Sequence, residues 1–238
     1  MRIVKIVLVA TMLLAGPAWG QQIERLDLLT QEDFRLLSED LGAAFSYRPQ
    51  TPTEPLGITG FDIGIAVTAA KIQHQDILQK ASSDTADATL VIPTLRVHKG
   101  LPFGFDIGAM YASVPGSNIK YYGGELRYAI VEGGVAMPAI GLRGSVSKLG
   151  GVDQLAMDTR GFDLSISKGF AFITPYAGIG RVRINSDPKG VPALQSESVS
   201  LGKAFVGLGV KLALLNFNLE ADKTGDVKAY SVKIGLRF

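Results

Sequence analysis

The sequence predicts an all-β fold: an antiparallel, up-and-down transmembrane β-barrel with a short N-terminal helix. Three observations predict it. Apolar residues recur at every second position in segments of roughly ten residues or more. The alternate positions carry glycine and charge, and turn-forming residues separate the segments. After the N-terminal region, no stretch approaches the roughly 18 consecutive apolar residues of a spanning helix, so the 47% hydrophobic content is dispersed over strands.

The N-terminus has the three parts of a secretory signal peptide. Arg2 and Lys5 precede an apolar stretch over 6–15, and Ala18-Trp19-Gly20 supplies small residues for cleavage. The apolar stretch is about half the roughly 20 residues that a membrane-spanning helix needs. We therefore expect the first twenty residues to be a signal peptide, cleaved near Gly20.

The composition excludes several classes of protein. The chain has 24 Lys and Arg against 22 Asp and Glu, so its charge does not favour a nucleic-acid partner. It has no cysteine, which excludes a disulfide framework, thiol chemistry and a lipid attached after the signal peptide. At this length, one domain with its own core or a closed barrel is expected.

The predicted barrel covers residues 58–238. In the first segment, Ile58–Lys71, Phe61 and Ile65 lie on one face, whereas Asp62 and Ala66 lie on the other. The same split recurs along the chain and predicts ten strands, at Ile58–Lys71, Thr89–His98, Leu101–Val114, Asn118–Val131, Val135–Lys148, Leu155–Lys168, Phe170–Ile184, Val199–Leu212, Leu215–Asp222 and Val227–Phe238.

The connections between these segments alternate in length, as an up-and-down barrel requires. Short turns are expected at Lys99–Gly100, Glu132–Gly134, Lys168–Gly169 and Ala213–Leu214. Generally longer loops are expected at Ile72–Ala88, Pro115–Ser117, Leu149–Gln154, Asn185–Ser198 and Lys223–Asp226. Short turns are typical of the periplasmic rim and longer loops of the cell exterior. Ten strands that start in the periplasm return the C-terminus to it.

Residues 21–57 form a separate N-terminal segment, either periplasmic or plugging the barrel. Thr30–Leu41 is typical of a short helix, with Thr30 as N-cap and Asp33 three positions later. Asp40–Tyr47 then alternates like another strand, which alone would give an odd count. The segment therefore lies outside or inside the barrel, or it adds a pair and the barrel has twelve strands.

The faces of the strands indicate which side is the lumen. A soluble calyx would bury its apolar face, but here the polar face also collects glycine, which a crowded interior favours. Aromatic residues near the strand ends of the apolar face are typical of interfacial girdles. We therefore expect an inward network of charged residues at Asp62, Arg96, Asp106, Glu125, Arg127, Arg143, Arg181, Arg183, Lys203, Lys211, Glu220, Lys233 and Arg237. Asp163 lies on the same polar face.

The last strand carries a resemblance to a protein class. It reads AYSVKIGLRF, with apolar residues alternating up to the final phenylalanine: Tyr230, Val232, Ile234, Leu236 and Phe238. This pattern resembles the C-terminal assembly signal of bacterial outer-membrane β-barrel proteins. The resemblance implies location in the outer membrane of a Gram-negative bacterium. It also implies outer-membrane lipid and, through this strand, the barrel-assembly machinery as partners.

The sequence offers few residues for catalysis. His74 lies in the first long loop, two positions before Asp76, and His98 lies beside a predicted periplasmic turn. A histidine near an aspartate in a polar loop is typically solvated, and no G-x-S-x-G, H-E-x-x-H or phosphate-binding glycine loop accompanies it. We expect no catalytic residue, no cofactor and no metal site.

The function predicted is therefore that of a non-enzymatic outer-membrane protein with a structural or interaction role. Barrels of about eight strands are filled by side chains, whereas open pores need about sixteen or more. A packed network of ion pairs would fill this narrow lumen. The alternative is a narrow channel or transporter for small anionic solutes, because basic residues are in modest excess on the last four strands. A surface hydrolase is a more distant alternative, and nothing indicates the oligomeric state.

Overall fold

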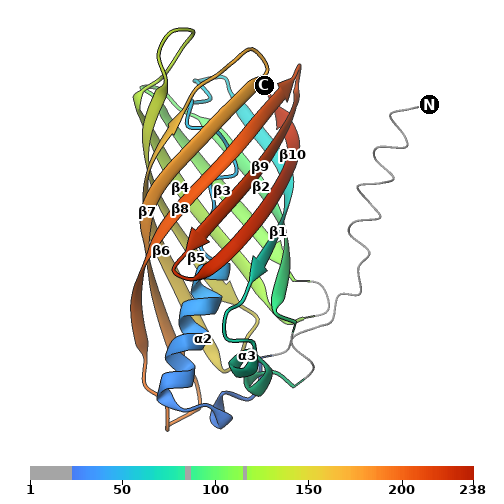
Figure 1. The fold of residues 1–238 in the computed structure, drawn as a ribbon, viewed down its shortest axis with the longest axis vertical. Helices are drawn as coiled ribbons and strands as arrows, with labels where there is room; N and C mark the ends of the chain where they lie inside the picture. Colours follow the sequence, from blue (N-terminus) through green and yellow to red (C-terminus); the bar gives the residue numbers. More distant parts are fainter. Residues whose placement is uncertain (1–22, 84–86, 115–116) are drawn as a thin grey trace, which may run out of the picture.

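The chain forms a closed barrel of ten antiparallel strands in the computed structural model, which describes residues 23–83, 87–114 and 117–238. Each strand pairs with its neighbours in sequence, and β1 closes the barrel against β10 (Figure 1). The predicted up-and-down barrel of ten strands is confirmed, and the alternative of twelve is wrong. The predicted signal peptide lies outside the described residues.

All ten predicted segments contribute one strand each. The strands are β1 (Phe61–Lys71), β2 (Thr89–Gly100), β3 (Phe105–Ser113), β4 (Lys120–Val131), β5 (Ala139–Gly150), β6 (Leu155–Ser167), β7 (Ile173–Pro188), β8 (Glu197–Leu212), β9 (Leu215–Thr224) and β10 (Val227–Arg237). The short helices are η1 (Leu26–Leu28), α2 (Gln31–Ala44) and α3 (Gln75–Ala81).

The two rims of the barrel differ in their connections. One rim carries the short turns and the C-terminus, where Phe61 N donates to Phe238 O at 2.7 Å. The other rim carries the longer loops together with α2 and α3, at the lower end of Figure 1. One connection at this rim is shorter than the predicted loop Lys223–Asp226: only Gly225 and Asp226 separate β9 from β10. Gly225 has a φ of 58°, a conformation that glycine adopts without steric cost.

Helix α2 begins at a capping box. The Thr30 side chain accepts from Asp33 N, while the Asp33 side chain accepts from Thr30 N. The helix continues to Ala44, so the expected strand over Asp40–Tyr47 is wrong. The spacing of Leu37 and Leu41 places both on one buried helical face, and that burial overrides the short alternation that follows.

The long-loop half of the lumen contains an apolar core. It forms between α2, α3 and the inward side chains of the strands, and its members include Phe34, Leu37, Leu41, Leu78, Tyr121, Leu149, Met157 and Ile184. Gly42 permits the close approach of α2 to β7, because a Cβ at Gly42 would overlap Ile184. The helix is thus held inside one end of the barrel.

The outward face of the barrel is an apolar belt. Ile65 is 54% exposed on this face, whereas its neighbour Ala66 points inward and is 1% exposed. Exposed phenylalanines, including Phe103 and Phe172, lie at the short-turn rim. The paired Tyr111 and Tyr122 of β3 and β4 lie toward the long-loop rim. Apolar residues outside and charge inside are the arrangement of a barrel surrounded by lipid rather than water.

None of the helices within the described ranges is both long and apolar enough to cross a membrane.

Candidate functional site

The lumen of the short-turn half is occupied by the chain itself. After α2 ends, residues 45–57, which we call the luminal segment, run through the barrel to the start of β1. The segment has no regular secondary structure, and its residues from Phe45 to Thr53 are buried. Its backbone amides and carbonyls must therefore find partners on the barrel wall, because buried unpaired polar groups are costly.

Cationic side chains of the wall satisfy the carbonyl oxygens of this segment. Four of them, from different strands, donate hydrogen bonds to it, and Arg96 Nη2 also reaches Pro49 O at 3.4 Å. The bonds are Lys203 Nζ to Tyr47 O at 2.5 Å, Arg96 Nη2 to Arg48 O at 2.8 Å, Arg127 Nη1 to Pro52 O at 3.2 Å and Arg237 Nη2 to Glu54 O at 3.3 Å. The wall cations therefore hold the backbone of the luminal segment along its length.

Polar oxygens of the wall satisfy the amides of the segment in the same way. Gln50 N donates to Glu220 Oε2 at 2.8 Å, and the same carboxylate oxygen accepts from Tyr176 OH at 3.0 Å. Leu56 N donates to Asp106 Oδ1 at 3.0 Å. Both signs of charge in the lumen are therefore used to bind one extended stretch of backbone.

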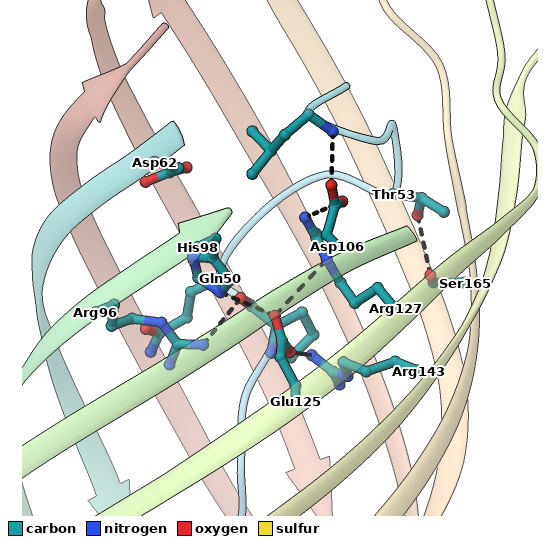
Figure 2. A network of polar contacts seen from close by, with 12 residues as sticks. Gln50, Thr53, Asp62, Arg96, His98, Asp106, Glu125, Arg127, Arg143 and Ser165 are labelled. Carbon is teal, nitrogen blue, oxygen red and sulfur yellow. Dashed lines mark hydrogen bonds and ion pairs between the residues drawn. The ribbon is translucent and has the colours of Figure 1, made fainter. Parts of the chain in front are cut away.

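Charged side chains of the wall also form ion pairs with one another. Lys233 Nζ lies 2.6 Å from Asp62 Oδ1, and both groups are buried. Arg127 Nη2 lies 2.7 Å from Asp106 Oδ2. Figure 2 shows Asp62, Asp106 and Arg127 among the polar side chains of the lumen.

Glu125 lies at the centre of this network. Its carboxylate lies 2.8 Å from His98 Nε2 and 3.5 Å from Arg143 Nη1. Arg143 also pairs with Asp163, which in turn lies 3.9 Å from Lys203 Nζ. Glu125 of β4 and Asp163 of β6 thus each lie between basic side chains, which come from β2, β5 and β8.

Side chains of the luminal segment complete the network. Arg48 Nε donates to Asp222 Oδ1 at 2.7 Å. The guanidinium of Arg96 lies 4.7 Å from the centre of the Tyr47 ring, within range of a cation–π interaction. The segment therefore contributes a charge and an aromatic ring as well as its backbone.

Little space remains between the segment and the wall. A cavity of about 20 Å³ lies beside Pro52 and Thr53, enough for about one water molecule. Inward glycines provide room for rings: a Cβ at Gly178 would overlap Phe205, and one at Gly207 would overlap Tyr176. The arrangement binds a peptide segment tightly and leaves no wide path through the described part of the barrel.

The structure places most of the predicted network inside the lumen. The residues found there are Asp62, Arg96, Asp106, Glu125, Arg127, Arg143, Lys203, Glu220, Lys233 and the partly buried Arg237. Three predicted members are not. Arg181 and Arg183 point outward and are exposed, and Lys211 is exposed at the short-turn rim. The predictions for Arg181 and Arg183 were wrong because, at this level of β7, the inward face is the apolar one. The buried Val182 and Ile184 face the helix, so the charged residues that alternate with them point outward.

Sequence reasoning missed three residues of the site. Asp222 lies within the predicted ninth strand and shares its alternation with Glu220, so it could have been placed inward on the same ground. His98 alternates with Arg96 and could have been placed inward for the same reason. Arg48 carried no such signal, because it lies in an irregular segment whose path depends on the closed barrel.

The long-loop rim places His74 beside an aspartate other than Asp76. His74 Nδ1 lies 3.2 Å from Asp40 Oδ2, which also accepts from the backbone amides of Gln73 and His74. Asp40 thus anchors the loop before α3 to the end of α2. Within the described ranges, no group of three or more His, Asp or Glu is placed to hold a metal ion.

No family model matches this sequence, and no curated protein matches it. Solved structures that are similar include the N-terminal β-barrel domain of Pseudomonas aeruginosa OprF, at 11% identity, 76% coverage of this chain, 99% of that chain and a TM-score of 0.38. The porin KdgM has 13% identity, covers 74% of this chain and 99% of its own, with a TM-score of 0.36. Yersinia pestis Ail has 15% identity, with 75% and 97% coverage and a TM-score of 0.27. The likeness concerns the barrel fold alone.

Proposed function

We propose that this chain is an outer-membrane β-barrel protein of a Gram-negative bacterium, non-enzymatic, with a closed lumen and a structural or interaction role. The apolar belt supports insertion into a membrane, because lipid-facing residues of such barrels are apolar. The resemblance of the last strand to an assembly signal supports the outer membrane in particular. Its partners are then outer-membrane lipid and the barrel-assembly machinery.

One observation supports the proposal of a closed lumen: charged side chains of the wall form hydrogen bonds with the backbone of the luminal segment. Lys203 and Arg96 donate to consecutive carbonyls, at Tyr47 and Arg48. A cation that lines a water-filled anion path is free to exchange ligands with passing ions. Here the donors are instead committed to peptide oxygens, and removing them would leave those oxygens unpaired. The charge network therefore serves to hold the segment in place.

Paired folding and conductance measurements test this proposal. Lys203→Gln and Arg96→Gln each remove a charged donor to a buried carbonyl, so each variant should lower the free energy of unfolding by about 1–3 kcal/mol. The native protein should show no steady current in a planar bilayer. Lys211→Gln is the matched control, because this exposed lysine has the same charge at the rim. A steady anion-selective current that Lys203→Gln reduces, at unchanged stability, would instead favour the narrow channel.

The role of the terminal strand is tested by removing Phe238. If Tyr230, Val232, Ile234, Leu236 and Phe238 form an assembly signal, deletion of Phe238 should lower the folded amount in the outer membrane while export and signal cleavage continue. Because Phe238 also hydrogen-bonds Phe61, spontaneous refolding into detergent serves as the control. A deletion that lowers refolding and cellular yield equally would show a defect of barrel closure rather than of recognition.

A further inference from the structure

Basic residues gather on the outer wall immediately beyond the apolar belt, toward the long-loop rim. On β6 the outward positions change from Phe162 to Arg160. On β7 they change from Ile179 to Arg181 and Arg183, and on β5 Lys148 occupies the corresponding position. These side chains are exposed on the outside of the barrel, so the charge network of the lumen does not explain them.

Two of these cations face each other directly. Arg160 and Arg183 are partners in the antiparallel register of β6 and β7. Like charges at such opposed positions destabilise a sheet unless another group compensates them. Asp158 offers partial compensation, with its Oδ2 at 3.8 Å from Arg160 Nε, but this carboxylate also accepts from Asn185 at 3.0 Å. Arg160 therefore lies beside one carboxylate that is already engaged, while Arg183 Nε donates to the neutral Ser198 Oγ at 3.2 Å.

A groove lies on the outer wall over β4, β5 and β6, with Arg160 in its lining and Arg183 next to Arg160 on β7. Its volume is about 340 Å³, and its lining includes Lys148, Arg160 and the acidic Asp158 together with Tyr122 and Val146. Gly124 is responsible for part of the hollow, since a Cβ there would meet only one atom, at 3.4 Å. The groove is therefore basic toward the long-loop rim and apolar toward the belt.

We propose that this groove binds a phosphorylated, multi-acylated lipid of the outer leaflet. A phosphate would lie between Arg160, Arg183 and Lys148, and an acyl chain would lie over Gly124 and Val146. Three cations against Asp158 favour an anionic head group, and guanidinium groups bind phosphate through two parallel hydrogen bonds. This inference rests on the proposed location in the outer membrane, and it names one lipid site on the barrel.

Binding of a defined probe to the full mature chain in detergent tests the site. The probe is hexa-acylated, bis-phosphorylated lipid A, with its dephosphorylated form and inorganic phosphate as comparators, and native mass spectrometry reads the bound fraction. We expect the native protein to bind the phosphorylated lipid, and the double variant Arg160→Gln/Arg183→Gln to bind it about tenfold more weakly through loss of two charge-assisted contacts. The matched control Lys189→Gln/Lys211→Gln removes two exposed charges elsewhere and should bind as the native protein does.

A second variant separates the lipid from its phosphate. Gly124→Leu fills the groove without touching the arginines, so it should weaken lipid binding and leave any binding of inorganic phosphate unchanged. Equal binding of phosphorylated and dephosphorylated lipid, or unchanged binding by the double arginine variant, would overturn the proposal. If the protein nevertheless folds into phospholipid vesicles, only this site fails. Failure to insert into any bilayer would overturn the proposed function itself.

Discussion

The two halves of the lumen are filled by opposite chemistry. Toward the long loops, α2 packs Phe34 and Leu41 against inward apolar side chains, with the character of a small globular core. Toward the short turns, charged side chains such as Arg96 and Glu220 enclose the luminal segment. A helix satisfies its own backbone hydrogen bonds and needs apolar neighbours, whereas an irregular segment needs donors and acceptors from the wall. The secondary structure of the occupant thus explains the composition of each half.

Strand β6 shows the change from an apolar to a polar inward face within one element. Near the long loops, Leu155 and Met157 point inward, while Arg160 points outward. Farther along, Asp163 points inward and Leu164 outward. The apolar face therefore passes from the inside of the barrel to the outside where the strand enters the belt. Alternation by itself shows that two faces differ, but it does not show which face is inside at every level.

The largest expected effect is loss of a buried charge in the polar half. Lys233→Met leaves Asp62 without its partner at 2.6 Å, and an uncompensated buried ion costs about 3–5 kcal/mol. Chemical unfolding in lipid vesicles measures the loss. Lys228→Met, at an exposed position of the same strand, is the control and should change stability by less than about 0.5 kcal/mol. Restoration of much of the loss by adding Asp62→Asn would establish the unpaired charge as its cause.

A comparable but smaller effect is expected in the apolar half. Leu41 is fully buried between α2 and the wall, so Leu41→Ala leaves a cavity that should cost about 2–4 kcal/mol. The control is Leu28→Ala, because Leu28 is 49% exposed in η1. An unfolding free energy unchanged by Leu41→Ala would mean that α2 is not held in the lumen, and the contrast between the two halves would then fail.

The sequence sufficed to predict the barrel because every strand has the same constraint: its two faces meet different surroundings, so its residues alternate in polarity. Period-two alternation located all ten strands, and Thr30 with Asp33 located the start of α2. The path of the luminal segment was not predictable, because Arg48 and Gln50 are positioned by partners on distant strands. The inward charges were predictable where lipid surrounds the barrel. They were mispredicted at Arg181 and Arg183, where the apolar face turns toward α2.

The smallest expected effect tests that reversal on β7. Arg181 is exposed on the outer wall, while the adjacent Val182 is 2% exposed against the interior. Arg181→Gln should therefore change the unfolding free energy by less than about 0.5 kcal/mol. Val182→Gln, one position along, introduces an amide among apolar neighbours and should cost about 1–3 kcal/mol. Measured together, the pair determines which face is inside at this level. If Arg181→Gln were the more damaging change, β7 would carry its charge inward along its whole length, and the apolar half of the lumen could not exist as described.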